Sequence, residues 1–137
     1  TPNLKEAEVL SGMKITSIAE MELAGKRILA ECGCANVLVK GGHLEGAALD
    51  ILCAADGTMY RFEETRIDTV NSHGTGCTLS AAIASYLAQG MDVQQAVTKA
   101  KAYLTKALYY AKDDKIGAGH GPVRHNYILQ EPEAGQA

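Results

Sequence analysis

The chain has 137 residues and a mass of 14.5 kDa, with 47% apolar and 21% charged residues, which suits one folded domain and excludes general disorder. Its net charge is -3, so we expect neither a nucleic acid nor an anionic membrane as a partner. No apolar run approaches the roughly 20 residues of a membrane-spanning helix, and the first residues show no signal-peptide pattern. The four cysteines suit neither a disulfide framework nor a zinc knuckle, and together these features predict a soluble, cytoplasmic protein.

Two capping patterns open the chain. Asn3 and Glu6 have the spacing of a helix N-cap and its acidic partner, and they predict a helix over residues 4–10. Ser17 begins a second such pattern, followed by an apolar helical period that ends at Gly33. We therefore expect two helices before the first strand.

A strand and a hairpin are predicted next. Residues 37–39 are wholly apolar and end in Lys40-Gly41-Gly42, which is typical of a parallel strand buried on both faces. Residues 49–53 and 59–65 flank Asp56-Gly57, a pair that favours the tight turn of an antiparallel hairpin. The first half of the chain therefore predicts an α/β fold with a parallel strand and an antiparallel ribbon.

The second half is predicted to be mainly helical. A loop over residues 71–76 opens onto an alanine-rich helix over residues 77–89. Asp92 caps a last helix, whose apolar residues recur regularly from Val93 to Ala111. Lysines take its other side, and we interpret them as a solvated face.

The segment with the clearest chemical meaning is Gly74-Thr75-Gly76-Cys77, which leads into a helix. Glycines let a ligand approach the backbone, and the first amides of a helix have no internal partners. Together with the helix dipole they form a site for a phosphate group; the alternative is a loop that only needs glycine. A helix N-terminus also favours the thiolate form of a cysteine, so Cys77 is a candidate base or nucleophile, the alternative being a buried structural cysteine.

Three further features are candidates for binding. Lys40 ends an apolar strand, where ligands gather in open α/β sheets, and such a lysine can meet a nucleotide phosphate or simply mark where the strand reaches water. Asn3 and Glu6 are candidates too, with a simple helix cap as the alternative. Three alternate glycines and a proline shape the loop over residues 117–122. His120 in this loop and His125 shortly after it are five residues apart and could suggest a metal site, but a third ligand is not evident.

Four segments of the chain resemble one known family. They are Asn3-Leu4-Lys5-Glu6-Ala7-Glu8, Lys40-Gly41-Gly42-His43, His73-Gly74-Thr75-Gly76-Cys77-Thr78-Leu79-Ser80 and Gly119-His120-Gly121-Pro122-Val123-Arg124-His125. In this order they resemble the C-terminal half of a hydroxymethylpyrimidine (phosphate) kinase of thiamine biosynthesis, within the ribokinase-like superfamily. Most sugar kinases and typical pyridoxal kinases of that superfamily carry aspartate where Cys77 stands. The chain departs from the family at Ser72, where threonine is common, and at Arg124, where asparagine is common.

The resemblance implies a fold and a set of site residues. It implies the C-terminal half of a three-layer α/β/α fold with a mostly parallel sheet and an antiparallel hairpin, in which residues 1–127 form the nucleotide-binding part and 128–137 a flexible tail. Gly74, Thr75, Gly76 and the amide of Cys77 would form the anion hole, and Cys77 would be the general base. Asn3 and Glu6 would help to hold Mg2+ and the phosphates, Lys40 and Gly42 would contact the ATP phosphates, and Gly119, His120 and Gly121 would lie near the nucleotide.

The resemblance also implies an activity. It is the ATP-dependent phosphorylation of 4-amino-5-hydroxymethyl-2-methylpyrimidine and its monophosphate. The reaction would use ATP and Mg2+, and a need for a monovalent cation is left open. The intact enzyme would be a homodimer. Family members are about twice as long, so we expect this chain to be a fragment with weak or no activity alone, whose partner is the missing N-terminal half. Two alternatives stay open, a pyridoxal kinase of the same superfamily and a non-catalytic nucleotide-binding fragment.

Overall fold

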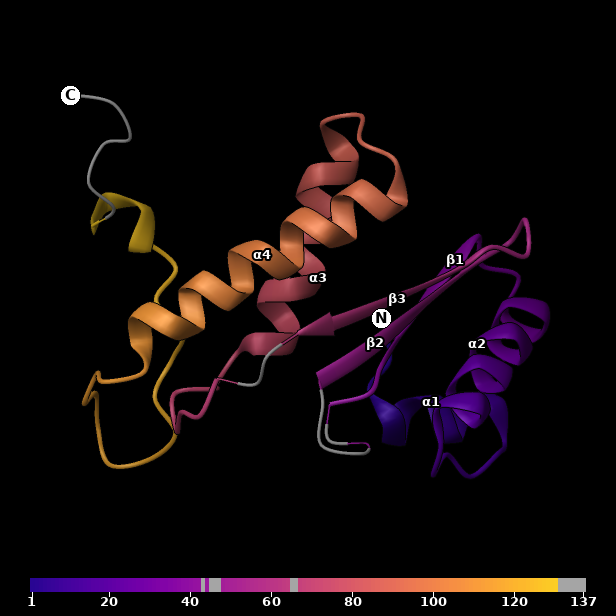
Figure 1. Cartoon of the computed structure of the whole chain (residues 1–137), viewed down its shortest axis with the longest axis horizontal. Helices are drawn as coiled ribbons and strands as arrows, with labels where there is room; N and C mark the ends of the chain where they lie inside the picture. Colours follow the sequence, from indigo (N-terminus) through magenta and orange to yellow (C-terminus); the bar gives the residue numbers. More distant parts are fainter. Residues whose placement is uncertain (43, 45–47, 65–66, 131–137) are drawn as a thin grey trace. The chain divides into compact units, whose positions relative to one another are not determined.

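The computed structural model describes residues 1–42, 44, 48–64 and 67–130. The chain forms two compact units, Thr1–Arg66 (unit 1) and Ile67–Ala137 (unit 2) (Figure 1). His43, the last residue of the second motif, and residues 131–137 of the predicted tail lie outside the described residues. Within the described ranges, no helix combines the length and the apolar character needed to cross a membrane.

Unit 1 begins with two capped helices, α1 (Leu4–Ser11) and α2 (Ile18–Cys32). The Asn3 side chain accepts a hydrogen bond from the Glu6 amide at 2.9 Å, and Glu6 Oε2 accepts one from the Asn3 amide at 2.8 Å. These two bonds satisfy backbone donors that the first turn of a helix leaves open. A glycine in the left-handed region follows each helix, as is common at helix ends. Both helices confirm the prediction from the capping patterns.

Three strands form one sheet in the order β1-β2-β3, with bounds β1 (Asn36–Lys40), β2 (Ala48–Ala54) and β3 (Met59–Glu64). β2 and β3 are antiparallel and confirm the hairpin predicted at Asp56-Gly57. The apolar run of β1 is buried along its length, which confirms that both of its faces are covered.

The described strands do not form the mostly parallel sheet that was expected, because both ladders are antiparallel. Residues 41–47 connect β1 to β2, and this connection is shorter than the crossover of a dozen or more residues that parallel neighbours need. Within the described part of unit 1, parallel pairing is limited to a bridge between Asn3 and Lys40, where the Lys40 amide donates to the Pro2 carbonyl at 2.9 Å. In the described part of unit 1, the parallel order therefore occurs only where the chain before α1 meets the end of β1.

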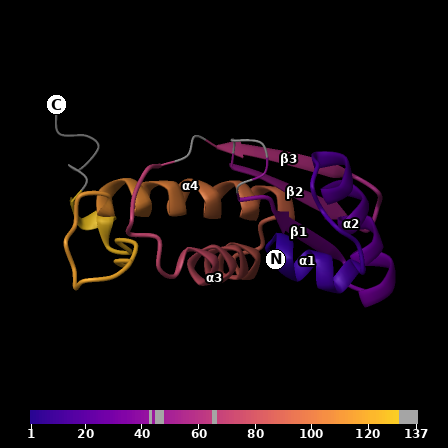
Figure 2. The ribbon, with the colours of Figure 1, turned by 90° about the horizontal axis from the view of Figure 1, so that it is seen from below.

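The core of unit 1 lies between α2 and one face of the sheet (Figure 2). Gly25 of α2 brings the helix close to β2, since a Cβ at this position would overlap Cys53 Sγ. Arg61 of β3 donates to Glu22 of α2 at 2.6 Å at the edge of this interface. The main core residues come from α2 and from the facing positions of β1 and β2: Met21, Ala24, Ile28, Val37, Val39, Leu49, Ile51 and Cys53.

Unit 2 is built on two packed helices, α3 (Thr75–Ala88) and α4 (Val93–Ala111) (Figure 1). The Asp92 side chain accepts a hydrogen bond from the Gln95 amide at 2.8 Å, which confirms the predicted cap of α4. The chain then returns along α4, where Tyr127 stacks on Tyr110 with ring centroids 5.6 Å apart. Tyr127 begins a short 3-10 helix, η2 (Tyr127–Gln130).

Candidate functional site

The predicted residues of unit 1 gather where α1 begins and β1 ends. The parallel bridge sets Asn3 beside Lys40, and the capping box holds Glu6 against Asn3. Asn3 and Glu6 are exposed and Lys40 is half-buried. Both capping partners are used by the helix, as the simpler interpretation required, but the capping bond uses Glu6 Oε2 and not Oε1. The cluster therefore offers one carboxylate oxygen and one ammonium group to a ligand.

The turn after β1 is held by a buried carboxylate. The Gly41 amide donates to the Leu49 carbonyl at 2.9 Å and to Asp50 Oδ1 at 3.1 Å. A Cβ at Gly41 would overlap the Leu49 carbonyl oxygen and lie 2.8 Å from Met21 Cε, so a larger residue does not fit there. Asp50 thus fixes the turn that carries Lys40. Asp50 was not among the residues predicted from the sequence, although an aspartate inside an otherwise apolar strand is a signal of such a role.

In unit 2, Gly74-Thr75-Gly76-Cys77 forms the entry to α3. Gly74 is the N-cap, with a φ of 83°, and no side chain caps the helix. The Thr78 amide donates to the Gly74 carbonyl at 2.9 Å, whereas the amides of Gly76 and Cys77 meet no acceptor in the described part of the chain. Two outward N–H groups at the positive end of a helix dipole are suited to an anion.

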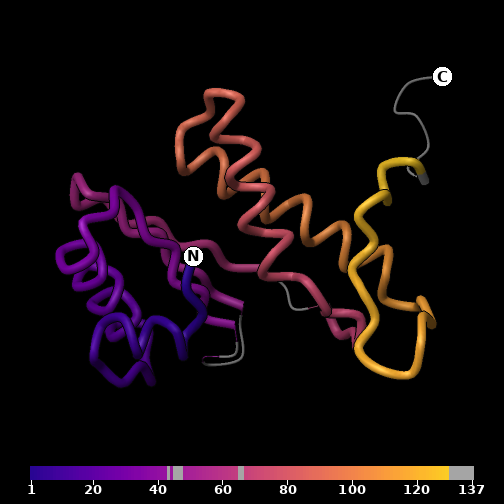
Figure 3. The backbone as a smooth tube through the Cα atoms, turned by 180° about the vertical axis from the view of Figure 1, so that it is seen from behind, coloured from indigo at the N-terminus to yellow at the C-terminus, as the bar shows by residue number. Residues whose placement is uncertain are grey.

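The second glycine loop lies directly beside this entry (Figure 3). The His73 amide donates to the Gly121 carbonyl at 3.0 Å, and His73 forms a parallel bridge with Pro122. His120 Nδ1 lies 3.1 Å from the Val70 carbonyl oxygen, so the ring carries its proton on Nδ1 in this contact. The structure therefore brings together two motifs, at residues 74–77 and 119–121, that the sequence predicted separately.

The cysteines differ in environment. Cys77 is exposed in the first turn of α3, so it is not a buried structural cysteine. Cys53 is the buried cysteine, and burial raises the pKa of its thiol. A thiol that is exposed next to two open amides can meet a bound anion, whereas the Cys53 thiol only fills the core of unit 1.

A family comparison decides what kind of chain carries these features. The model of the family described as phosphomethylpyrimidine kinase matches residues 1–124. The chain belongs to this phosphomethylpyrimidine kinase family. The resemblance found in the four motifs is thereby confirmed.

Other members of the phosphomethylpyrimidine kinase family are similar over most of this chain. A hydroxymethylpyrimidine/phosphomethylpyrimidine kinase of Rhizobium meliloti is 48% identical over 126 residues, which is 91% of this chain and 47% of the relative. A thiamine biosynthesis bifunctional protein of Geobacter sulfurreducens is 48% identical over 127 residues, or 91% of this chain and 25% of the relative. The chain thus spans about half the length of the kinases that it matches.

Solved structures of related kinases have the same fold over the matched part. The pyridoxal kinase from Staphylococcus aureus in complex with AMP-PCP and pyridoxal is 34% identical, with a TM-score of 0.84 over 95% of this chain and 48% of that chain. An ADP complex of Bacillus subtilis pyridoxal kinase is 35% identical, with a TM-score of 0.83 over 95% of this chain and 50% of that chain. This family member therefore has an α/β fold of the ribokinase-like kind.

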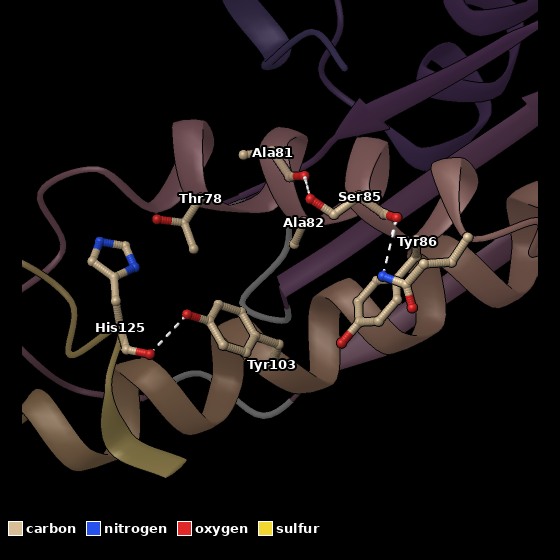
Figure 4. Close-up of a pocket in the computed structure, with 8 residues that line it drawn as sticks. Thr78, Ala81, Ala82, Ser85, Tyr86, Tyr103 and His125 are labelled. Carbon is tan, nitrogen blue, oxygen red and sulfur yellow. Dashed lines mark hydrogen bonds between the residues drawn. The ribbon is translucent and has the colours of Figure 1, made fainter. Parts of the chain in front are cut away.

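A groove of about 370 Å³ follows α3 in unit 2 of this phosphomethylpyrimidine kinase family member (Figure 4). It begins at Thr78, the residue after Cys77, and small side chains of α3 form one wall. Tyr103 of α4 closes the other side and donates to the His125 carbonyl at 2.9 Å. The lining residues are Thr78, Ala81, Ala82, Ser85, Tyr86, Gln89, Tyr103 and His125. Among the described residues, no group of three His, Cys, Asp or Glu side chains is placed to hold a metal ion.

Proposed function

We propose that this chain supplies the phosphate-binding part of an ATP-dependent kinase that acts on 4-amino-5-hydroxymethyl-2-methylpyrimidine and on its monophosphate. The observation that supports this most strongly is the pair of acceptor-free amides, Gly76 and Cys77, at the entry of α3 in a member of the phosphomethylpyrimidine kinase family. Phosphoryl transfer depends mainly on positioning and on neutralising charge. Outward amides at a helix N-terminus supply both.

Cys77 is the general base in this proposal. With the unphosphorylated pyrimidine, the hydroxyl oxygen attacks the γ-phosphorus of ATP, the bond from that phosphorus to the β–γ bridging oxygen breaks, and ADP leaves. With the monophosphate, an oxygen of its phosphate group is the nucleophile instead. The Cys77 thiolate takes the proton of the attacking hydroxyl. The amides of Gly76 and Cys77 donate to the oxygens of the transferring group and stabilise its negative charge. Thr75 lies in the same turn, where its amide donates to the Ser72 carbonyl at 3.4 Å. Gly74 allows the left-handed backbone that starts this turn.

Asn3, Glu6, Lys40 and Gly42 serve the nucleotide phosphates in the same reaction. Lys40 contributes a positive charge, and its position is fixed by the turn that Asp50 anchors. Glu6 Oε1 is a hard oxygen donor of the kind that Mg2+ prefers, so Glu6 fits as a ligand or as a partner of the waters that Mg2+ retains. When bound, Mg2+ neutralises charge on the phosphates. In unit 2, the loop with Gly119, His120 and Gly121 serves the nucleotide beside the anion site.

The remainder of the kinase fold belongs, in this proposal, to the part of the relatives that this chain does not match. The parallel bridge between Asn3 and Lys40 supports it, because it shows the chain entering α1 parallel to β1. A strand that continued this pairing would begin the expected parallel sheet and third layer. Most of the pyrimidine pocket would come from the same part, and the intact enzyme would be a homodimer. Residues 1–137 alone should then show weak or no turnover.

Binding and complementation test this proposal. The purified chain is titrated with ATP and Mg2+ in a calorimeter, and ADP formation is measured with and without the N-terminal part of the Rhizobium meliloti relative. We expect nucleotide binding by the chain and turnover of the pyrimidine only after the second part is added. Robust turnover by the chain alone would show that it is not a fragment. Binding without turnover in the completed enzyme would support the non-catalytic alternative.

Pyridoxal is the second candidate substrate. The observation in its favour is the likeness to pyridoxal kinases, one of them in complex with AMP-PCP and pyridoxal. The measurement is kcat/KM for both substrates in the completed enzyme, with turnover compared between potassium and tetramethylammonium buffers to test the monovalent cation. A higher kcat/KM for the pyrimidine is expected, and a higher value for pyridoxal would replace the proposed substrate.

A further inference from the structure

Asn71 is the most deeply buried of the polar residues that are buried in unit 2, which also include Thr78 and Lys101. Its side chain is 2% exposed, although it lies in the loop that leads to α3. Asn71 Nδ2 donates to the Ala111 carbonyl at 2.6 Å and to the Asp114 carbonyl at 2.8 Å. Ala111 is the last residue of α4, and Asp114 lies in the turn that follows it, where the Asp114 amide also donates to the Ala111 carbonyl at 3.0 Å. One amide group therefore ties the loop before α3 to the end of α4.

The other side of the Asn71 amide lies against the second glycine loop. A Cβ at Gly121 would overlap Asn71 Oδ1 and lie 2.9 Å from Asn71 Cγ. The same Gly121 accepts a hydrogen bond from the His73 amide at 3.0 Å, two residues after Asn71. Asn71 and Gly121 thus fit against each other at the place where the two loops meet. Neither an ionised aspartate nor an aliphatic residue can replace this amide, because neither supplies the N–H groups that donate to these two carbonyls.

An ion pair supports the far end of the same network. Arg124 Nε donates to Asp114 Oδ2 at 3.0 Å, and Arg124 Nη2 contacts Asp114 Oδ1. The Asp114 backbone, which accepts from Asn71, is therefore held from its side chain as well. Arg124 is a position at which this chain departs from its family, and the ion pair gives that arginine a structural partner.

We propose that Asn71 is a positioning residue that sets the entry of α3 against the 117–122 loop, and so fixes the direction of the Gly76 and Cys77 amides. The effect of Asn71 on catalysis rests on the proposed function, whereas its effect on the position of the α3 entry does not. Small displacements of positioned groups lower phosphoryl transfer strongly while substrate binding changes less. Loss of the Asn71 amide should therefore lower kcat rather than raise the KM for the pyrimidine.

Hydrogen exchange tests the structural half on the 137-residue chain without any substrate. Exchange of the His73 amide is compared with that of Ala100, a fully buried residue in the middle of α4, so that changes in global stability cancel. We expect this ratio to rise at least about tenfold in Asn71→Asp and Asn71→Ala. Val97→Ala, which removes buried methyl groups from α4, is the matched control and should leave the ratio unchanged.

Gly121→Ala provides a second variant that keeps the Asn71 amide. As a single substitution, Gly121→Ala should raise the exchange ratio. In an Asn71→Ala background it should add nothing, because Asn71 Oδ1 is then absent.

Turnover is measured in a chimeric enzyme in which this chain replaces the matching part of the Rhizobium meliloti relative. Asn71→Asp should lower kcat at least about tenfold with the KM changed less than about twofold. An exchange ratio equal to that of Val97→Ala, or an unchanged kcat in an active chimera, would overturn the proposal. An inactive unsubstituted chimera would count against the proposed function alone, since the exchange ratio still decides the structural role of Asn71.

Discussion

Gly25 gives a sharp test of how α2 packs on the sheet of unit 1. Replacing glycine by alanine inside a helix ordinarily stabilises it, by about 0.5–1 kcal/mol. At Gly25 the added methyl would overlap Cys53 Sγ, and it would also touch Cys53 Cβ and Val39 Cγ2 at 3.4 Å. Cys53 is 1% exposed, so its thiol has little room to move. Overpacking of this kind costs about 1–3 kcal/mol. We therefore expect Gly25→Ala to lower the free energy of unfolding by about 1–2 kcal/mol.

A double-mutant cycle isolates the contact. Cys53→Ala removes Sγ and makes room for the new methyl, so Gly25→Ala should be neutral or slightly stabilising in that background. The coupling energy between the two positions should then be about 2 kcal/mol. Urea unfolding followed by far-ultraviolet circular dichroism measures all four chains, and exposed Lys26→Ala on the same helix is the control, with an expected change below about 0.5 kcal/mol. An increase of stability in Gly25→Ala with Cys53 intact would refute the packing argument.

Two other predictions use the cysteines and the capping side chains. Iodoacetamide should modify exposed Cys32 and Cys77 in the folded chain, whereas Cys53 should react only in denaturant, because Cys53 is buried and burial raises the pKa of its thiol. Peptide mass spectrometry measures the modification of each cysteine, and modification of Cys53 in the folded chain would contradict the fold of unit 1. Hydrogen bonds from the Thr16 amide and hydroxyl, both 2.7 Å long, lower the pKa of Glu20 from its ordinary value of 4.5. The ionised Glu20 carboxylate therefore contributes stability above pH 4.5, and this contribution is lost as the pH falls through the pKa of Glu20 in the folded state. The stability difference between the unsubstituted chain and Glu20→Gln should therefore be constant near neutral pH and shrink below pH 4.5, and a difference that grows on acidification would show that the sign is wrong.

Local signals predicted the helices of this chain well. The caps at Asn3, Ser17 and Asp92 depend on residues three positions apart, and the structure has the corresponding hydrogen bonds. The Asp56-Gly57 turn is equally local and determined its hairpin correctly. The partner of β1 is not a local property. A buried apolar run fits a parallel or an antiparallel neighbour, and here the short connection to β2 decided for the antiparallel one.

The candidate site was predictable in its parts but not in its arrangement. Glycine spacing identified residues 74–77 and 117–122 separately, whereas their contact rests on a hydrogen bond between His73 and Gly121 that spans much of unit 2. Asn71 and Asp50 were missed for a related reason. An asparagine in a loop and an aspartate in a strand take their meaning from carbonyls and amides that approach from distant parts of the chain.

The most direct test of the central claim is the kcat of the chimeric enzyme with Cys77 and with Cys77→Ala, measured as ATP-dependent phosphorylation of hydroxymethylpyrimidine. A base at this position contributes roughly 100-fold or more, and the amides of the anion site remain in the variant. We predict clear turnover with Cys77 and a loss of roughly 100-fold or more in kcat with alanine. An unchanged kcat would contradict the role of Cys77 as the base and leave the entry of α3 as an anion site only.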